Sequence, residues 1–317
     1  MKLAINKEML AGARKQFCLD IGMSFEDYEQ NPYKKAYITK SKYKEGTTLP
    51  ATAGARCYAG SDAFFWAIIC MGQLFLSVDE QLYEWACKEF SDCAPEWFCE
   101  YDNLRRIDEK LREYGRKVGD THVYFLPGEG TACETVQIGE NDSDVGKNIP
   151  CEADIGQPLT AYQWYDREEI LRFQEGNRFK SAICFSPTQP DVLAVAAIRP
   201  YTMLQSEAAT STAAGGKVPG ELYAKGKEFN QAHMAGMAGV SEDGKYLWQI
   251  GINVDVDSTG QGLAARLVRM IKEEVIRRGK IPFYGTSESH IISQTVGIKA
   301  GFVPAFTTVY AKRQAED

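Results

Sequence analysis

Two glycines, Gly260 and Gly262, separate an apolar run that ends at Val254 from a run whose apolar residues repeat every four positions. That repeat comprises Leu263, Leu267, Ile271 and Val275. It predicts a helix with one apolar stripe, preceded by a strand and a short turn. The first backbone N–H groups of a helix lack partners, and the helix dipole favours an anion near them. Because glycine lets the backbone approach an anion without an intervening side chain, this spacing predicts a phosphate-binding turn.

The two most familiar nucleotide motifs do not fit this turn. A Walker loop continues with Lys and then Ser or Thr, whereas Leu263 and Ala264 follow Gly262 here. The Rossmann fingerprint requires a third glycine, and Ala265 stands in that place. It also requires an acidic residue after a second strand, but the next acidic residues fall inside the predicted helix.

The turn resembles motif A of the GNAT (Gcn5-related N-acetyltransferase) superfamily, which reads Arg/Gln-x-x-Gly-x-Gly/Ala. Residues 259–264 read Thr-Gly-Gln-Gly-Leu-Ala, so Thr259 stands where the family has Arg or Gln. Further along, residues 289–302 resemble the family's Asn-x-x-Ser and Leu-Gly-Phe segment. His290 takes the Asn place there, and Ala300 takes the Leu place.

The predicted order of elements agrees with this resemblance. A capping box of Asp166 and Glu169 opens a helix upstream of the turn. Strands are predicted at residues 191–197, 235–240, 246–254 and 281–287, the second and third joined by a hairpin turn at 241–245. The order of helix, three strands, glycine turn, helix, strand and helix is the family's order. The resemblance covers about residues 155–317.

The resemblance implies an α/β (α+β) domain with a mixed, splayed central sheet that binds acetyl-CoA. In the family, acetyl-CoA lies where two parallel strands part. Here these would be the strand that ends at Val254 and the strand at residues 283–286. The first strand's backbone would then bind the pantetheine arm, and the turn would wrap the pyrophosphate. The implied contacts are Asn253, Val254, Asp255, Val256, Thr259, Gly260, Gln261, Gly262, Leu263, Ala264, His290 and Ser293.

The chemistry implied by the resemblance is direct attack of a substrate amine on the thioester. The protein then has to position both reactants, stabilise an oxyanion and move protons. The candidate catalytic residues are His290, Tyr284, Tyr310 and Glu288. Each has a structural alternative: His290 and Ser293 as residues that cap a helix, and the tyrosines as core or rim residues.

Two departures from the family's pattern leave the proton chemistry open. The usual acid is a tyrosine five residues before the Phe of Leu-Gly-Phe, and that position is Gly297. No Glu lies in residues 246–254, where many members keep a base, and the nearest carboxylates are Asp255 and Glu288. A base relayed through water, or an amine that arrives neutral, is an alternative to a side-chain base.

Two domains are predicted, residues 1–150 with a linker and residues 151–317. The first is predicted to contain helices at 7–19, after Asp79, and from an Asn103 cap to Gly115, with strands within 63–76 and at 121–125. Its element order resembles the degenerate GNAT-like half of two-domain bacterial members. Its glycines are too scattered for a phosphate turn, so we expect it to bind no CoA and to shape acceptor access. The alternative is an independent domain with a separate task.

The composition of the chain limits the classes of partner that we expect. The 317 residues are 44% hydrophobic and 25% charged, with a net charge of −7, which argues against nucleic acid as the main partner. The nine cysteines form no Cys-x-x-Cys pair, so reduced thiols and no metal are expected. The longest apolar run, 63–76, is shorter than the roughly 20 residues that span a bilayer. With no signal core at the N-terminus, the sequence predicts a cytoplasmic monomer or homodimer without membrane contact.

Two polar stretches are predicted to have no regular secondary structure. Residues 127–160 are typical of a connecting segment, and residues 205–220 are either a lid or a surface insertion. The functional hypothesis is an N-acetyltransferase acting on a small amine or an amino terminus. The alternative is a catalytically silent protein on the same scaffold that binds CoA or a partner. The acyl group and the acceptor are not specified by these residues.

Overall fold

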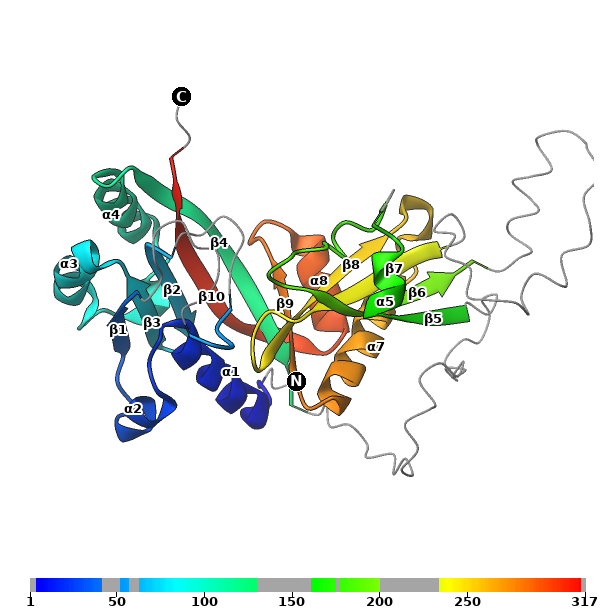
Figure 1. Ribbon diagram of the computed structural model, residues 1–317, viewed down its shortest axis with the longest axis horizontal. Coiled ribbons are helices and arrows are strands. Elements are labelled where there is room, and N and C mark those ends of the chain that lie inside the picture. The colour runs from blue at the N-terminus through cyan, green and yellow to red at the C-terminus, as the bar shows by residue number, and fades with distance from the viewer. Residues whose placement is uncertain are drawn as a thin grey trace, which may run out of the picture.

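A computed structural model describes residues 4–41, 52–56, 63–129, 161–174, 177–199 and 234–314. The predicted connecting segment beyond residue 129 and the predicted insertion at 205–220 lie outside these ranges. Where described, the chain is a mixed α/β structure, as the sequence predicts, and its strands form one large sheet (Figure 1).

Ten strands form this sheet in the order β1-β3-β2-β10-β4-β9-β8-β7-β6-β5. The strands are β1 (Ala36–Lys40), β2 (Phe65–Cys70), β3 (Gln73–Val78), β4 (Arg116–Pro127), β5 (Ala161–Asp166), β6 (Asp191–Ile198), β7 (Met234–Ser241), β8 (Leu247–Val254), β9 (Ile281–Thr286) and β10 (Phe302–Arg313). Only β1–β3 and β8–β9 pair in parallel, and the other neighbours are antiparallel.

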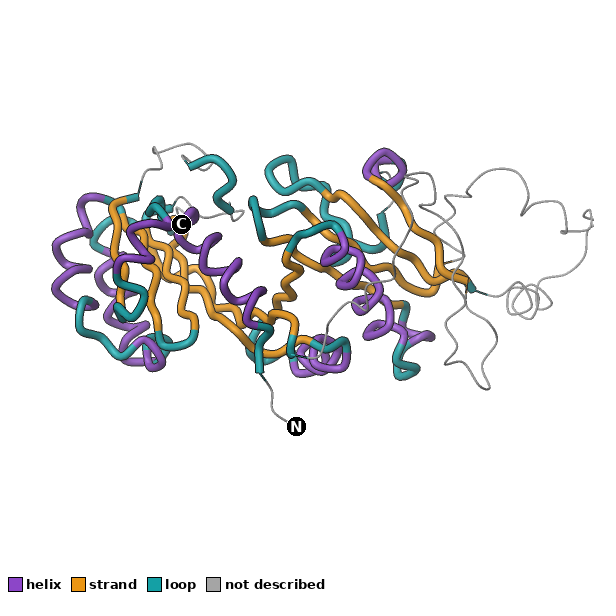
Figure 2. Tube along the Cα trace, turned by 90° about the horizontal axis from the view of Figure 1, so that it is seen from below, coloured by secondary structure: helices purple, strands orange, loops and turns teal. Residues whose placement is uncertain are grey.

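Helices flank the strands at both ends of the molecule (Figure 2). They are α1 (Lys7–Asp20), α2 (Phe25–Gln30), α3 (Glu80–Phe90), α4 (Tyr101–Arg112), α5 (Arg167–Leu171), α7 (Leu263–Arg277) and α8 (Ile291–Lys299), with short 3₁₀ turns η1 (Pro95–Trp97) and η4 (Val256–Ser258). The predicted stripe of α7 packs on the sheet, with Leu267, Ile271 and Val275 fully buried. Helix α1 packs in a different cluster, together with Leu247 and Phe283.

Two strands cross between the halves of the chain. Strand β4 comes from the N-terminal half, yet it lies between β9 and β10 of the C-terminal half. Strand β10 is the last strand of the described chain, and it pairs with β2 from the N-terminal half. Both run diagonally through the middle of Figure 1. The sheet is therefore continuous across the predicted boundary at residue 150, and each half completes the strand order of the other.

Local sequence signals account for most element boundaries. The predicted capping box forms, because Asp166 accepts from Glu169 N and the Glu169 side chain accepts from Asp166 N. The apolar run at 63–76 forms the hairpin of β2 and β3, with its turn at Met71 and Gly72, both of positive φ.

The prediction that Asn103 caps a helix is wrong. Helix α4 begins at Tyr101 with Glu100 at the N-cap. The Asn103 side chain instead donates to the Trp97 carbonyl oxygen and accepts from Arg106. Its amide is therefore used to join the first turn of the helix to η1.

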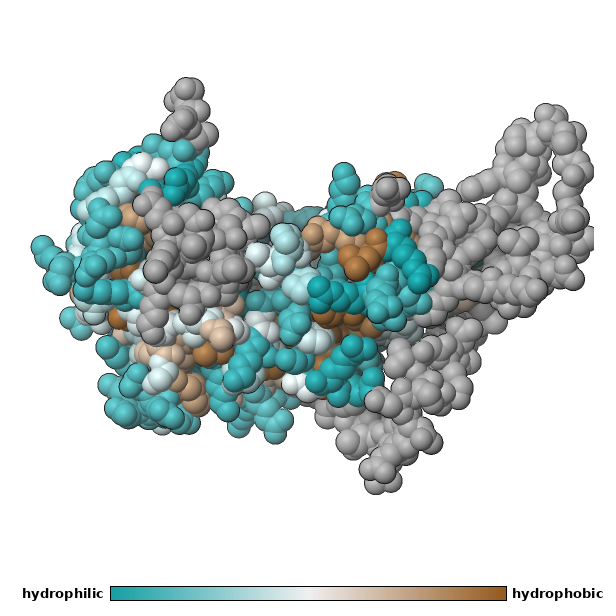
Figure 3. All heavy atoms as spheres, viewed as in Figure 1, coloured by the Kyte–Doolittle hydropathy of each residue, from teal (hydrophilic) through white to brown (hydrophobic). Residues whose placement is uncertain are grey.

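The surface drawn in Figure 3 is mostly hydrophilic, with small apolar patches. Within the described ranges no helix combines the length and apolar character that crossing a bilayer requires. The same residues contain no group of His, Cys, Asp and Glu able to hold a metal ion. The cysteines they include are free thiols, namely Cys18, Cys70, Cys87, Cys93, Cys99 and Cys184.

Candidate functional site

The two parallel strands β8 and β9 part halfway along their length. Their register runs from Leu247 opposite Ile281 to Ile250 opposite Tyr284 and then stops. Beyond that point β8 pairs only with β7, as far as Val254. Strand β9 continues against β4 instead. The splay that the sequence predicts is therefore present, and the backbone of β8 beyond Ile250 borders a gap.

The predicted glycine turn lies between this gap and α7. Gly260 and Gly262 have left-handed φ values of 79° and 76°, which glycine adopts without strain. A Cβ added at either position would meet no atom within 4 Å. Gly262 is the N-cap of α7, so no side chain caps this helix, and its first turn holds no acidic residue. The start of α7 is therefore a helix N-terminus suited to an external anion.

Three helix starts of the N-terminal half differ from this one, whereas α4 also begins without a side-chain cap. The side chains of Asn6, Ser24 and Asp79 cap α1, α2 and α3, and each accepts backbone N–H bonds. Glu80 adds a further negative charge to the first turn of α3. At these three helices the caps occupy backbone donors that a phosphate would need.

Opposite α7, a polypeptide segment crosses the sheet at the gap. Gly239 and Gly251 face each other on β7 and β8. A Cβ at Gly239 would lie 2.2 Å from the Ala182 carbonyl oxygen, and one at Gly251 2.1 Å from that of Ser181. Only glycine permits this approach. Asn253 fixes the same segment, because its Oδ1 accepts from Ser181 N at 2.5 Å.

Asp255 lies just past the end of β8 and is paired with two arginines. Its carboxylate accepts from Arg178, and Oδ2 lies 2.6 Å from Nη2 of Arg199. Asp255 is therefore engaged by side chains, which reduces its availability as a base. The two arginines are site residues that sequence analysis misses, because each is an isolated cation in its own segment.

Tyr284 and Ser293 are brought together on the α8 side of β9. Their hydroxyl oxygens are 2.7 Å apart. Burial raises the pKa of Tyr284, while the bond to Ser293 opposes this rise. The Tyr284 ring lies against Gly297, where a Cβ would be 3.0 Å from Cδ1. The tyrosine missing at position 297 is thus replaced in space by one from the strand.

The other candidate catalytic residues are more scattered. His290 precedes α8, is exposed and makes no side-chain cap. Glu288 is exposed in the same loop. Tyr310 lies on β10, opposite Trp66 of β2 and Asp120 of β4. Asp120 lies beyond Val123, where the pairing of β4 with β9 ends. Burial raises the pKa of Tyr310, and the negative charge of Asp120 raises it further.

The remaining predicted contacts follow the path from strand to helix. Asn253 and Val254 end β8, and Val256 is highly exposed in η4. Thr259 bonds the Val256 carbonyl oxygen through its hydroxyl at 2.7 Å. Gln261 is exposed, and Leu263 and Ala264 open α7. These residues line one continuous stretch from the gap to the helix start.

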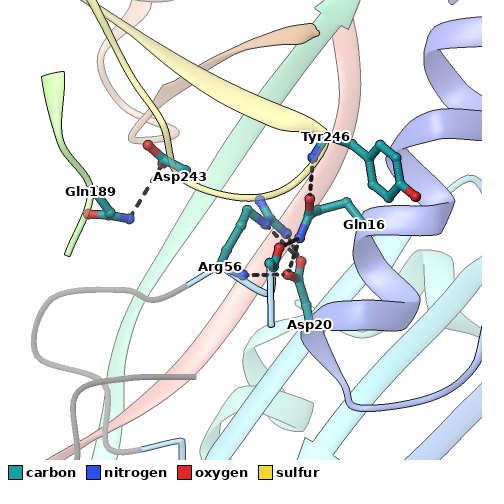
Figure 4. A network of polar contacts seen from close by, with 7 residues as sticks. Gln16, Asp20, Arg56, Gln189, Asp243 and Tyr246 are labelled. Carbon is teal, nitrogen blue, oxygen red and sulfur yellow. Dashed lines mark hydrogen bonds and ion pairs between the residues drawn. The ribbon is translucent and has the colours of Figure 1, made fainter. Parts of the chain in front are cut away.

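A polar network ties the N-terminal half to the β7–β8 turn (Figure 4). Asp20 and Arg56 form a fully buried ion pair at 2.7 Å. Gln16 donates to Asp20 at 2.9 Å and accepts from Tyr246 N at 2.8 Å. The network therefore holds the turn that precedes β8 against α1. In the same turn, burial raises the pKa of Asp243 to about 7.

Comparisons with known proteins find a likeness among solved structures alone. No family model matches the chain, and no curated protein does so significantly. A GNAT-family acetyltransferase from Colwellia psychrerythraea is 12% identical, with 98% of this chain and 97% of that chain covered and a TM-score of 0.36. A GCN5-related N-acetyltransferase-like protein from Streptococcus suis is 11% identical, with 68% and 69% covered and a TM-score of 0.34.

Proposed function

We propose that the protein is an N-acetyltransferase that transfers the acetyl group of acetyl-CoA to an amine of a small molecule or to an amino terminus. The observation that supports this most is the gap between β8 and β9 beside an uncapped helix start. A strand edge free for pantetheine and an anion site for pyrophosphate lie in sequence along residues 251–264. This is the arrangement that the sequence resemblance implies.

Acetyl-CoA binding would use the backbone first. The pyrophosphate would accept from N–H groups at Gly262 and the start of α7, where the helix dipole favours negative charge. The pantetheine arm would run along β8 between Ile250 and Val254 and place the thioester in the gap. Fixed backbone donors there would stabilise the oxyanion of the tetrahedral intermediate.

The acceptor amine would reach the thioester from the face that residues 179–183 cover, opposite α7. Nitrogen attacks the carbonyl carbon, the C–N bond forms, and the C–S bond breaks with its electron pair leaving on sulfur. Tyr284 and Ser293 together supply a hydroxyl pair on the α8 side of the gap. We assign them the protonation of the leaving thiolate, with Ser293 as the more exposed member of the pair.

The second candidate function is a catalytically silent protein that binds CoA or a partner. Gln249 favours it, because an amide occupies the strand in which many family members keep a glutamate base. Gly297 favours it as well, because it removes the usual acid.

Two measurements separate the candidates. Calorimetry with acetyl-CoA tests binding, and release of free CoA thiol in the presence of amines tests transfer. The amines would be a polyamine, an amino sugar, an amino acid and a tripeptide. Binding with transfer to at least one amine supports the enzyme. Binding without any transfer supports the silent protein, and no binding at millimolar acetyl-CoA contradicts both.

A further inference from the structure

We propose that His122, on the strand that the N-terminal half contributes, is the general base for the acceptor amine. This inference rests on the proposed transferase function. It assigns the proton acceptor to a residue outside the predicted C-terminal domain, and it gives β4 a chemical role as well as a structural one.

His122 lies on the face from which the acceptor would approach. Gly251 points at Ser181, so the odd-numbered residues of β8, including Gln249, share that face. A Cβ at Gly285 would lie 3.4 Å from Nε2 of Gln249 and 2.5 Å from the Tyr124 ring. Tyr124 therefore shares this face as well.

His122 follows Tyr124 at the next position on that face of β4, because alternate residues of a strand point the same way. The two ring centroids are 6.1 Å apart. Five positions on three neighbouring strands, from Gly251 to His122, thus lie on one face of the sheet, opposite α7, and Tyr124 among them is buried against the core that α1 covers.

The position along the strands is also suitable. Strand β4 pairs with β9 through Val123 opposite Thr286, the last residue of β9. His122 comes next on β4, level with the open end of the gap. Neighbouring strands are about 5 Å apart, so an amine held over the end of β9 is within reach of the imidazole.

The surroundings of His122 suit a base. Its side chain is 29% exposed, so the ring is partly shielded yet accessible. Among the described residues Nδ1 is buried and has no hydrogen-bond partner. The Asp120 carboxylate lies 4.0 Å from Nδ1. His290 and Glu288, by comparison, are exposed in a loop before α8.

The proton balance is complete with this assignment. An acceptor ammonium gives one proton to His122 and becomes a neutral amine. Its lone pair forms the C–N bond, and the intermediate collapses to an amide and a thiolate. The nitrogen loses a second proton, which passes through water to the Tyr284 and Ser293 pair and replaces the proton that this pair gives to the sulfur. The imidazolium then returns its proton to water, so no other reactant is needed.

The test compares His122→Gln, His122→Ala and a matched control, Thr121→Val, in the full-length chain. Thr121 is the neighbouring residue of β4 and faces the other side of the sheet. We expect both His122 variants to lower kcat by about 100-fold or more, the usual effect of removing a general base. The KM for acetyl-CoA should stay within about twofold, and Thr121→Val should match the wild type. Added imidazole should restore turnover to His122→Ala.

A second readout does not depend on turnover. The chain has three histidines, and the NMR signal of His122 is the one that His122→Gln removes. That signal should shift when an amine that supports transfer is added together with CoA. Wild-type turnover by His122→Gln, or an amine that leaves the signal in place, would overturn the assignment of His122 alone. Failure of the wild type to bind acetyl-CoA, or to transfer to any amine, would overturn the proposed function and this inference with it.

Discussion

The ring of Tyr284 occupies the space that a side chain at Gly297 would need, since a Cβ there would lie 3.0 Å from the ring. Strand β9 therefore supplies an aromatic hydroxyl where the resemblance leads one to expect it from α8. The hydroxyl is anchored on the same helix, 2.7 Å from the Ser293 oxygen. A tyrosine hydroxyl is therefore present in this region of the fold although position 297 is glycine.

Replacing Tyr284 with Phe should lower kcat by at least about tenfold, because the leaving thiolate loses its proton source. The free energy of unfolding should fall by only about 1 kcal/mol, the net contribution of one hydrogen bond. Thiol release and urea unfolding measure the two effects. Tyr37→Phe is the matched control, because it removes a partly buried bond to the Asn31 carbonyl oxygen far from the gap. An equal loss of kcat in both variants would contradict this role.

Replacing Gly262 with Val should abolish acetyl-CoA binding, because the added side chain would project into the space assigned to the pyrophosphate. Gly279 provides a close control at the other end of α7, with φ of 71° against 76° and open space around its Cβ. Gly279→Val should show a similar loss of stability from backbone strain, about 1 to 2 kcal/mol, and unchanged binding. Calorimetry with acetyl-CoA on both variants measures the difference in binding. Similar affinities would exclude this turn as the anion site.

The sequence reveals the local parts of this fold because each depends on neighbouring residues. The capping box at Asp166, the stripe of α7 and the β2–β3 hairpin all follow from patterns within a few positions. The crossing of β4 and β10 between the two halves depends on pairing between residues far apart in the sequence, such as Tyr124 and Phe306. No local pattern specifies such a register.

Some parts of the candidate site could likewise be predicted from the sequence, and others could not. The glycine turn is readable because its chemistry lies in consecutive residues. The charge cluster of Asp255 with Arg178 and Arg199 is not, because three separate segments meet only in the folded chain. The same holds for His122, which enters the site on a strand from the other half. Sequence spacing could therefore predict the turn that we propose for the cofactor, but not the residues that we propose on the acceptor side.

Stability should depend on pH through Asp243. Its pKa is raised by burial to about 7 in the folded protein, from about 4 in an unfolded chain. Between these values the folded state holds a proton that the unfolded state has lost. The free energy of unfolding should therefore fall as pH rises from about 4 to about 7, by at most about 4 kcal/mol.

Asp243→Asn should remove most of this decline, because an amide does not titrate. Urea unfolding at several pH values between 4 and 8 measures the slope for both proteins. A smaller slope should persist in the variant, since burial also raises the pKa of Asp191. Parallel curves for the two proteins would show that Asp243 does not titrate in this range.

The two halves should fold only together. Without residues 1–150, β9 loses its β4 neighbour, and β10 loses partners on both sides, from β2 and from β4. Unpaired edges of this length favour aggregation. We expect residues 151–317 expressed alone to be insoluble or unfolded, and residues 1–150 alone to behave likewise.

Expressed together, the two fragments should assemble one to one and bind acetyl-CoA, since a break in the connecting segment leaves every strand pair intact. Size-exclusion chromatography and calorimetry test this, with the unbroken chain as reference. A folded fragment 151–317 that binds acetyl-CoA as the whole chain does would show that β4 is dispensable, and it would return the site to the C-terminal half alone.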